Sequence, residues 1–112
     1  MNYTPAQHPV NVFKAALQLA LAEVFDGPPL TGPLGVNAMF ILPCPKSRQK
    51  KNYGKTWHTT KPDIDNLQKA LFDALNGLAW VDDKQIAEAV IRKQWAGKYD
   101  QAGCSVSIWK KE

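Results

Sequence analysis

One amphipathic segment between two strand-like segments sets the framework of this 112-residue sequence. Apolar residues recur at steps of three and four over 67–78, which predicts a helix with one buried face. Asn76-Gly77 predicts a left-handed cap at its end. Residues 34–42 alternate between two faces and residues 86–95 carry β-branched side chains, so each segment predicts a strand. This order favours a single α+β domain over residues 1–112.

Two further segments complete the predicted fold. A second helical period runs from Val12 to Val24 and is ended by the residues 26–29, Asp-Gly-Pro-Pro. Residues 103–109 alternate apolar and polar side chains and predict a last strand, which we expect to pair with 86–95 through a polar hairpin loop at 97–102. The expected architecture is a small β-sheet with two main helices packed against it.

The distribution of charge favours an anionic partner. The net charge is +4, and no acidic residue occurs between Asp26 and Asp63, where basic residues are concentrated. Residues 46–60 lack periodicity and contain two aromatic side chains, which predicts a mobile basic loop that contacts phosphates and unstacked bases. The candidate DNA-binding residues are Lys46, Arg48, Lys50, Lys51, Tyr53, Lys55, Trp57 and Lys61.

Four aspartates stand at the two ends of the central predicted helix, as Asp63 and Asp65 before it and Asp82-Asp83 after it. Carboxylates beside many basic residues indicate a protein that attracts a polyanion and holds a hard cation against it. In an extended stretch, Asp63 and Asp65 point to the same side about 6.6 Å apart and can share a cation. Lys69 then follows Asp65 by one helical turn. Asp83 reaches them only if the chain doubles back along roughly 18 Å of helix.

Each of these features also has an ordinary structural interpretation. Asp63 or Asp65 suits a helix N-cap, Asp82-Asp83 suits a solvated turn, and Lys69 is spaced to pair with a neighbouring aspartate. The basic loop is also consistent with a simple flexible connection. Spacing alone leaves both interpretations open.

The remaining composition favours a soluble, cytoplasmic protein. Cys44 and Cys104 lack metal-ligand spacing, which favours two free thiols in an intracellular protein. The N-terminus lacks the pattern of a signal peptide, and the longest apolar-rich stretch, 15–25, is too short and too polar to span a bilayer. We therefore expect no membrane association.

The runs KPDIDNLQKALFDALNG and WVDDKQI, over about 61–86, closely resemble the signature of the RusA family of Holliday-junction resolvases. The resemblance implies a RusA-like fold with a mixed sheet, a homodimer, and hydrolysis of branched DNA in recombination and repair with Mg²⁺ or Mn²⁺ and no small-molecule cofactor. It implies Asp63, Asp65 and Asp83 as metal ligands and catalytic residues, together with Lys69. Asp82, Asn66 and Gln85 match supporting positions.

The start of the sequence departs from that pattern. Members usually begin with a strand and a basic turn before a Tyr-Thr-Pro segment, which here stands at residues 3–5, so we expect the opening strand to be missing. Three alternatives stay open: a non-catalytic nucleic-acid-binding member of the same fold, a nuclease acting on other DNA structures, and a structural protein whose acidic cluster binds Ca²⁺. The resemblance also suggests a phage or prophage protein.

Overall fold

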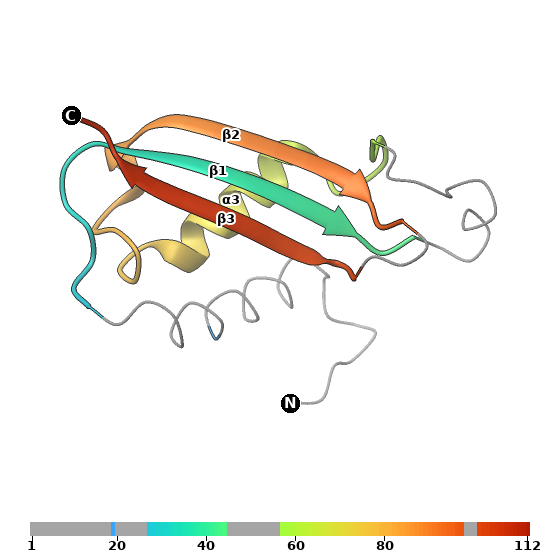
Figure 1. The fold of residues 1–112 in the computed structure, drawn as a ribbon, viewed down its shortest axis with the longest axis horizontal. Helices are drawn as coiled ribbons and strands as arrows, with labels where there is room; N and C mark the ends of the chain where they lie inside the picture. Colours follow the sequence, from blue (N-terminus) through green and yellow to red (C-terminus); the bar gives the residue numbers. More distant parts are fainter. Residues whose placement is uncertain (1–18, 20–26, 45–56, 98–100) are drawn as a thin grey trace.

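The computed structural model describes residues 19, 27–44, 57–97 and 101–112 (Figure 1). Their elements, in chain order, are β1 (Leu34–Leu42), α3 (Ile64–Leu75), the short 3₁₀ helix η1 (Asp83–Gln85), β2 (Ile86–Trp95) and β3 (Gly103–Lys110). The three predicted strands and the central helix are confirmed. Apart from one residue, the helix predicted from Val12 to Val24 lies outside the described residues.

The three strands form a mixed sheet in the order β2-β1-β3. β2 runs parallel to β1, with Ile86 opposite Leu34, whereas β3 runs antiparallel to β1. The predicted hairpin between β2 and β3 is therefore wrong, because each of them pairs with β1 instead. The reason is the apolar character of β1: it has few polar side chains on either face, and the central position of a sheet is where such a strand is best covered.

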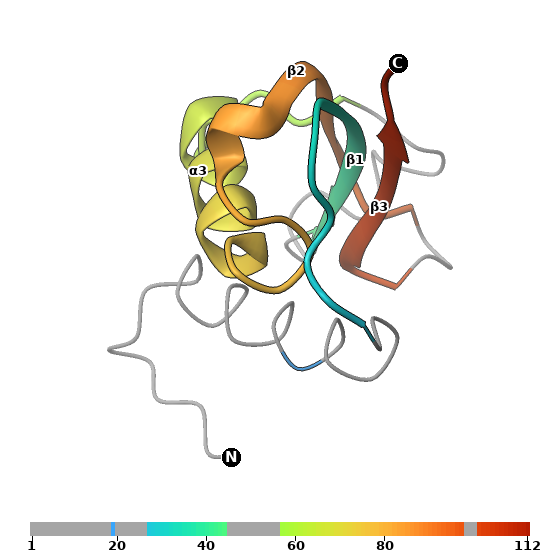
Figure 2. The same cartoon turned by 90° about the vertical axis from the view of Figure 1, so that its left-hand side faces the viewer.

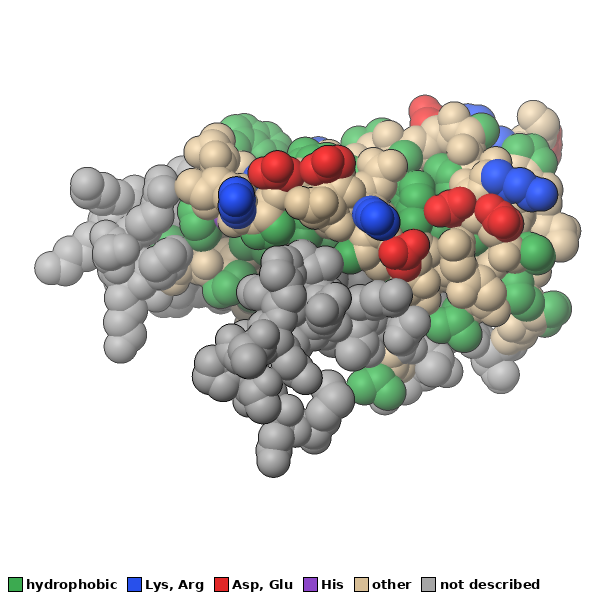
Figure 3. All heavy atoms as spheres, turned by 180° about the vertical axis from the view of Figure 1, so that it is seen from behind, with side chains coloured by type: hydrophobic (Ala, Val, Ile, Leu, Met, Phe, Trp, Pro, Cys, Tyr) green, Lys and Arg blue, Asp and Glu red, His purple; other side chains and the backbone are tan. Residues whose placement is uncertain are grey.

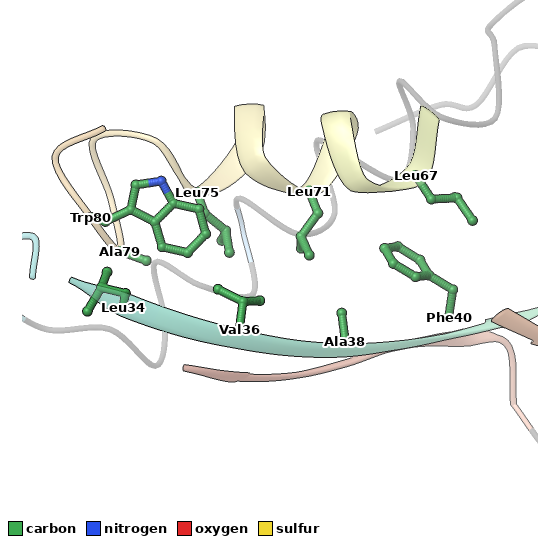
Figure 4. Packing of buried hydrophobic residues seen from close by; sticks show 9 residues of the cluster. All are labelled: Leu34, Val36, Ala38, Phe40, Leu67, Leu71, Leu75, Ala79 and Trp80. Atoms are coloured by element: carbon green, nitrogen blue, oxygen red, sulfur yellow. The ribbon is translucent and has the colours of Figure 1, made fainter. Parts of the chain in front are cut away.

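Helix α3 covers one face of the sheet, so the described part of the domain has two layers (Figure 2). In Figure 4 Leu67, near the start of α3, lies by Phe40, while Ala79 and Trp80 lie by Leu34. α3 therefore runs antiparallel to β1. Burial of each large apolar side chain stabilises such a layer pair by about 1.5–3 kcal/mol. The buried cluster consists of Leu34, Val36, Ala38, Phe40, Leu67, Leu71, Leu75, Ala79 and Trp80.

The end of α3 is fixed by a tight turn around Trp80. The buried indole N–H donates to Oδ1 of Asn76 at 2.5 Å, and its ring meets Phe72 edge-on at a centroid distance of 5.6 Å. Gly77 has φ 81°, which confirms the predicted left-handed position after the helix. The amide of Leu30 donates to the carbonyl of Ala79 and fastens this turn to the segment before β1.

The face of the sheet away from α3 carries a close contact between neighbouring strands. Trp109 of β3 lies over Gly35 of β1, and a Cβ atom at Gly35 would stand 2.3 Å from Cε2 of that ring. On the same face, Arg92 donates to Oδ1 of Asn37 at 3.2 Å. A side chain larger than hydrogen at position 35 therefore requires Trp109 to move.

Neither Cys44 nor Cys104 forms a disulfide bond, as predicted. Cys104 is half-buried near the start of the edge strand β3, and burial raises the pKa of its thiol to about 12. Within the described parts of the chain, no helix is both long and apolar enough to cross a membrane.

Candidate active site

The first acidic pair frames the start of α3. Asp63 occupies the N-cap position with extended backbone angles (φ −73°, ψ 156°), but its side chain makes no capping hydrogen bond. Oδ1 of Asp65 accepts from the amide of Asn66 at 2.9 Å. Both carboxylates are exposed. The side chain of Asp63 is therefore not used to cap the helix, and its oxygens are open to a ligand.

The approach to Asp63 is fixed by Lys93 from β2. The half-buried Lys93 ammonium donates to the carbonyl of Thr60 at 2.7 Å and to that of Pro62 at 2.8 Å. The Lys61-Pro62 peptide bond is cis. Two charge-assisted hydrogen bonds, to carbonyls two residues apart, hold the backbone that leads into the acidic pair. Sequence reasoning missed Lys93, because nothing in its local pattern distinguishes it from a surface lysine.

The end of the predicted basic loop packs along β2. Trp57 forms an antiparallel bridge with Gln94, and His58 is buried with its ring 4.2 Å from that of Trp95. Nε2 of His58 lies 3.3 Å from Oγ1 of Thr60. The indole of Trp57 is exposed. His58 therefore has a packing role, while Trp57 and Lys61 are presented at the surface beside the first acidic pair.

Lys69 stands on the exposed side of α3, one turn after Asp65. Within the described residues the ion pair present joins Lys111 to Glu88 at 2.9 Å, so Lys69 pairs with neither Asp65 nor Asp73. The prediction that Lys69 forms an ion pair on the helix surface is therefore not confirmed among the described residues. The ammonium is open to an anion.

The second acidic pair belongs to a rigid turn organised by Gln85. Its Oε1 accepts from the amides of Val81 and Asp82, both at 2.9 Å. Its Nε2 donates to the carbonyls of Leu30 at 3.0 Å and Gly32 at 2.9 Å. These four bonds use the full capacity of a glutamine amide. Gln85 thereby fixes the turn that carries Asp82 and Asp83 against the segment before β1.

Asp82 and Asp83 differ in what their side chains do. Oδ1 of Asp82 accepts from the amide of Lys84 at 2.9 Å and caps η1. Asp83 is the first residue of η1 and is half-buried. The side chain of Asp82 therefore has a local structural task at the start of η1.

The two acidic pairs lie at opposite ends of α3. Lys93, which binds the carbonyl of Pro62, pairs with Phe40 in the β1–β2 register. The helix η1 leads directly into Ile86, which pairs with Leu34 at the other end of β1. Six strand residues separate those β1 positions, or about 20 Å. Figure 3 shows the acidic side chains in separate groups rather than one cluster. Among the described residues no three Asp, Glu, His or Cys side chains are placed to hold one metal ion.

Comparison with known proteins identifies the family. The family model described as "Endodeoxyribonuclease RusA" matches residues 2–108, nearly the whole chain. The chain belongs to the RusA endodeoxyribonuclease family. A relative in Bacillus subtilis (strain 168), the uncharacterized protein YqaN, is 33% identical over 88 residues, which covers 72% of this chain and 62% of YqaN. The chain therefore spans less than two thirds of the length of that relative.

As a member of the RusA family, the chain has a donor set that suits a hard divalent cation. Mg²⁺ is commonly held by one or two carboxylates, with water and substrate phosphate completing its shell. The exposed oxygens of Asp63 and Asp65 fit that requirement, whereas Asp83 does not join them in this structure. Most predicted DNA-binding residues of this RusA-family chain lie outside the described residues: Lys46, Arg48, Lys50, Lys51, Tyr53 and Lys55.

Proposed function

We propose that this protein is a divalent-metal-dependent endodeoxyribonuclease that binds branched DNA and resolves Holliday junctions by phosphodiester hydrolysis. It acts as a homodimer in DNA recombination and repair, in the cytoplasm where such DNA is found, with Mg²⁺ or Mn²⁺ as cofactor and a phage or prophage as its setting. The observation that carries the proposal is the start of α3. There Asp63, Asp65 and Lys69 are exposed and free of ion pairs with described residues, in a chain of the RusA family.

The residues divide the chemical work as follows. A bound divalent cation would lower the pKa of the attacking water and polarise the phosphate. Asp63 and Asp65 would hold that cation, whereas Asp83, the third predicted ligand, lies at the other end of α3 within the chain. The ammonium of Lys69, one turn along α3, neutralises charge that develops on the phosphate oxygens in the transition state. Asn66 follows Asp65, and its backbone N–H donates to the Asp65 carboxylate.

DNA binding is assigned to the residues that precede the first acidic pair in the chain. Lys61 and Trp57 are exposed next to the first acidic pair, and the basic residues of 46–55 precede them in the chain. Lysine and arginine contacts to phosphates provide affinity, and an exposed indole provides a stacking surface for an unpaired base at the branch.

The direct test compares cleavage of a synthetic four-way junction with Mg²⁺ by wild type, Asp65→Asn and Asp73→Asn. Asp73 is the matched control, because it is an exposed aspartate two turns further along α3. We expect Asp65→Asn to lower the cleavage rate by at least about 100-fold while Asp73→Asn retains it. Equal rates for wild type and Asp65→Asn would rule out the proposed site.

A non-catalytic nucleic-acid-binding member of the same fold is the second candidate function. The separation of Asp83 from Asp63 and Asp65 within one protomer favours it. Tight binding of the junction without cleavage in either Mg²⁺ or Mn²⁺ would support this alternative.

A further inference from the structure

The sheet has an outer face, the one away from α3, that the described part of the chain leaves open. Figure 1 looks onto this face, with the strands in front of α3. Residues opposite one another in neighbouring strands point to the same face, as does every second residue along a strand. The outer face therefore includes the exposed or half-buried side chains of Asn37, Met39, Val90, Arg92, Ser105, Ser107 and Trp109.

Trp109 gives the outer face an aromatic surface. Its indole lies over Gly35, where a Cβ atom would stand 2.3 Å from Cε2 of the ring. Because Gly35 has no side chain, the indole is seated directly on the central strand, and Trp109 is still 38% exposed. An exposed aromatic ring on a sheet is a surface on which an unpaired nucleic-acid base can stack.

The charges of the outer face are complementary to a phosphate. Its carboxylate, Glu88, is paired with Lys111 at 2.9 Å. The exposed guanidinium of Arg92 donates to Oδ1 of Asn37 at 3.2 Å, which uses one of its five N–H groups. Since Glu88 is neutralised by Lys111, Arg92 leaves a net positive charge on this face, and the cation is directed to solvent beside the strands.

The spacing of these groups suits a short single strand of DNA. Trp109 and Arg92 stand opposite Gly35 and Met39, which are four residues or about 13 Å apart along β1. That length is close to the rise of about four stacked nucleotides, at about 3.4 Å each. The hydroxyl of Ser107 lies between the two positions and can bond a base edge or a phosphate.

Two other occupants fit the outer face less well. A duplex keeps the faces of its bases stacked inside, so it offers nothing to the indole, and one free cation binds its phosphates weakly. A protein partner is best held by a continuous apolar centre with a polar rim. Here the polar side chains of Asn37 and Ser107 interrupt the apolar surface between Val90 and Trp109.

We propose that the outer face binds a single-stranded segment of the DNA substrate, with a base stacked on Trp109 and a phosphate on Arg92. This inference rests on the proposed function and refines its substrate class, since it favours branched DNA that contains an unpaired arm over a fully paired junction. The strand bound there lies across the sheet from α3. It is therefore retained by the protein rather than presented to Asp63 and Asp65.

Binding of a short labelled oligothymidylate, measured by fluorescence anisotropy in EDTA, tests the site without any cleavage. Trp109→Leu and Arg92→Gln are each expected to raise the dissociation constant at least about fivefold. Trp109→Phe keeps an aromatic ring and should lose less. Lys110→Gln is the charge-matched control, because Lys110 is an exposed residue of β3 that lies opposite Leu34, on the α3 side of the sheet. Unchanged affinity in both Trp109→Leu and Arg92→Gln would contradict the proposal.

Photo-cross-linking locates the strand in the unaltered protein. An oligonucleotide that contains 5-iodouracil is irradiated with the full chain, and the cross-linked peptides are identified by mass spectrometry. A cross-link to Trp109 is expected, in addition to one at Trp57, which is 65% exposed and is part of the proposed DNA-binding residues. Cross-links at Trp57 without any at Trp109 would overturn the outer-face site.

The substrate preference is tested with two junctions of the same sequence, one fully paired and one with a single unpaired arm. Wild type should bind the second at least about threefold more tightly, and Trp109→Leu should abolish the difference. At saturating junction, Arg92→Gln keeps the wild-type Mg²⁺ dependence of cleavage, because Arg92 lies across the sheet from the acids. An equal preference in wild type and Trp109→Leu would count against the site.

The two proposals fail in different ways. Full activity of Asp65→Asn overturns the proposed function. Unaltered oligothymidylate affinity in the outer-face variants, together with no cross-link to Trp109, overturns the single-strand site and leaves the nuclease assignment standing.

Discussion

The Lys93 ammonium binds the carbonyl of Pro62 at 2.8 Å, immediately before the first acidic residue of α3. Lys93 lies near the end of β2, while Gln85, which fixes the second acidic pair, stands just before its start. One strand therefore positions both carboxylate groups through side chains at its two ends. That arrangement ties the geometry of the proposed site to the stability of the sheet.

Replacing Lys93 with methionine should weaken metal use as well as folding. Loss of both hydrogen bonds leaves the carbonyls of Thr60 and Pro62 without the ammonium, and we expect the free energy of unfolding to fall by about 1–3 kcal/mol. The Mg²⁺ concentration for half-maximal junction cleavage should rise several-fold, because Asp63 is no longer held in place. Arg92→Met is the control, since Arg92 contacts Asn37 on the opposite face. Identical Mg²⁺ dependence in the two variants would contradict this positioning role.

Gln85→Ala should loosen the turn that carries Asp82 and Asp83. It removes four hydrogen bonds, two of them to carbonyls of the segment before β1. Urea unfolding is expected to show a loss of about 1–3 kcal/mol. Gln85→Glu should be destabilised as well, because a carboxylate oxygen then faces the carbonyls of Leu30 and Gly32. Lys84→Ala, a neighbour whose side chain is exposed, should stay close to wild type, and a similar loss there would mean that the turn is generally sensitive.

Gly35→Ala should destabilise the sheet through its contact with Trp109. The new methyl group would overlap the indole, whose Cε2 stands 2.3 Å from the Cβ position. Overpacking of this kind lowers the free energy of unfolding by about 1–3 kcal/mol. In a Trp109→Ala background the same substitution should have little effect. A double-mutant cycle measures the coupling, and additive effects would show that the two residues do not meet.

Stability should decline at alkaline pH partly through Cys104. Burial raises the pKa of its thiol from 9.0 to about 12, so the folded chain keeps a proton that the unfolded chain loses between those values. The stabilisation is therefore fully present below pH 9 and decreases as the pH rises toward 12. Cys104→Ala should show a shallower decline in urea midpoint from pH 9 to 11. Val106→Ala, two residues further along β3, should lower stability without changing that slope.

The sequence by itself determined the elements and the family. Periods of three to four and of two depend on side chains close together in the chain, so the strands at 34–42, 86–95 and 103–109 were placed correctly from pattern alone. The helix predicted over 67–78 was found three residues earlier, as α3 (Ile64–Leu75), because Leu78 belongs to the turn after it. The motif from Asp63 to Lys69 and the Asp82-Asp83 pair that follows it are both visible in the sequence. Together they indicated the RusA family, and the family match over residues 2–108 confirms it.

Only the tertiary structure decided which strands pair and where the acidic pairs lie. β1 takes the central position because it is the strand with the fewest polar side chains, which separates β2 from β3 and makes the expected hairpin impossible. The hydrogen bonds of Gln85 to Leu30 and of Lys93 to Pro62 span 55 and 31 residues of chain, beyond the reach of any local pattern. Because α3 runs antiparallel to β2, Asp83 is left at the far end of the helix from Asp63, a separation that depends on the packing of the layers rather than on spacing in the sequence.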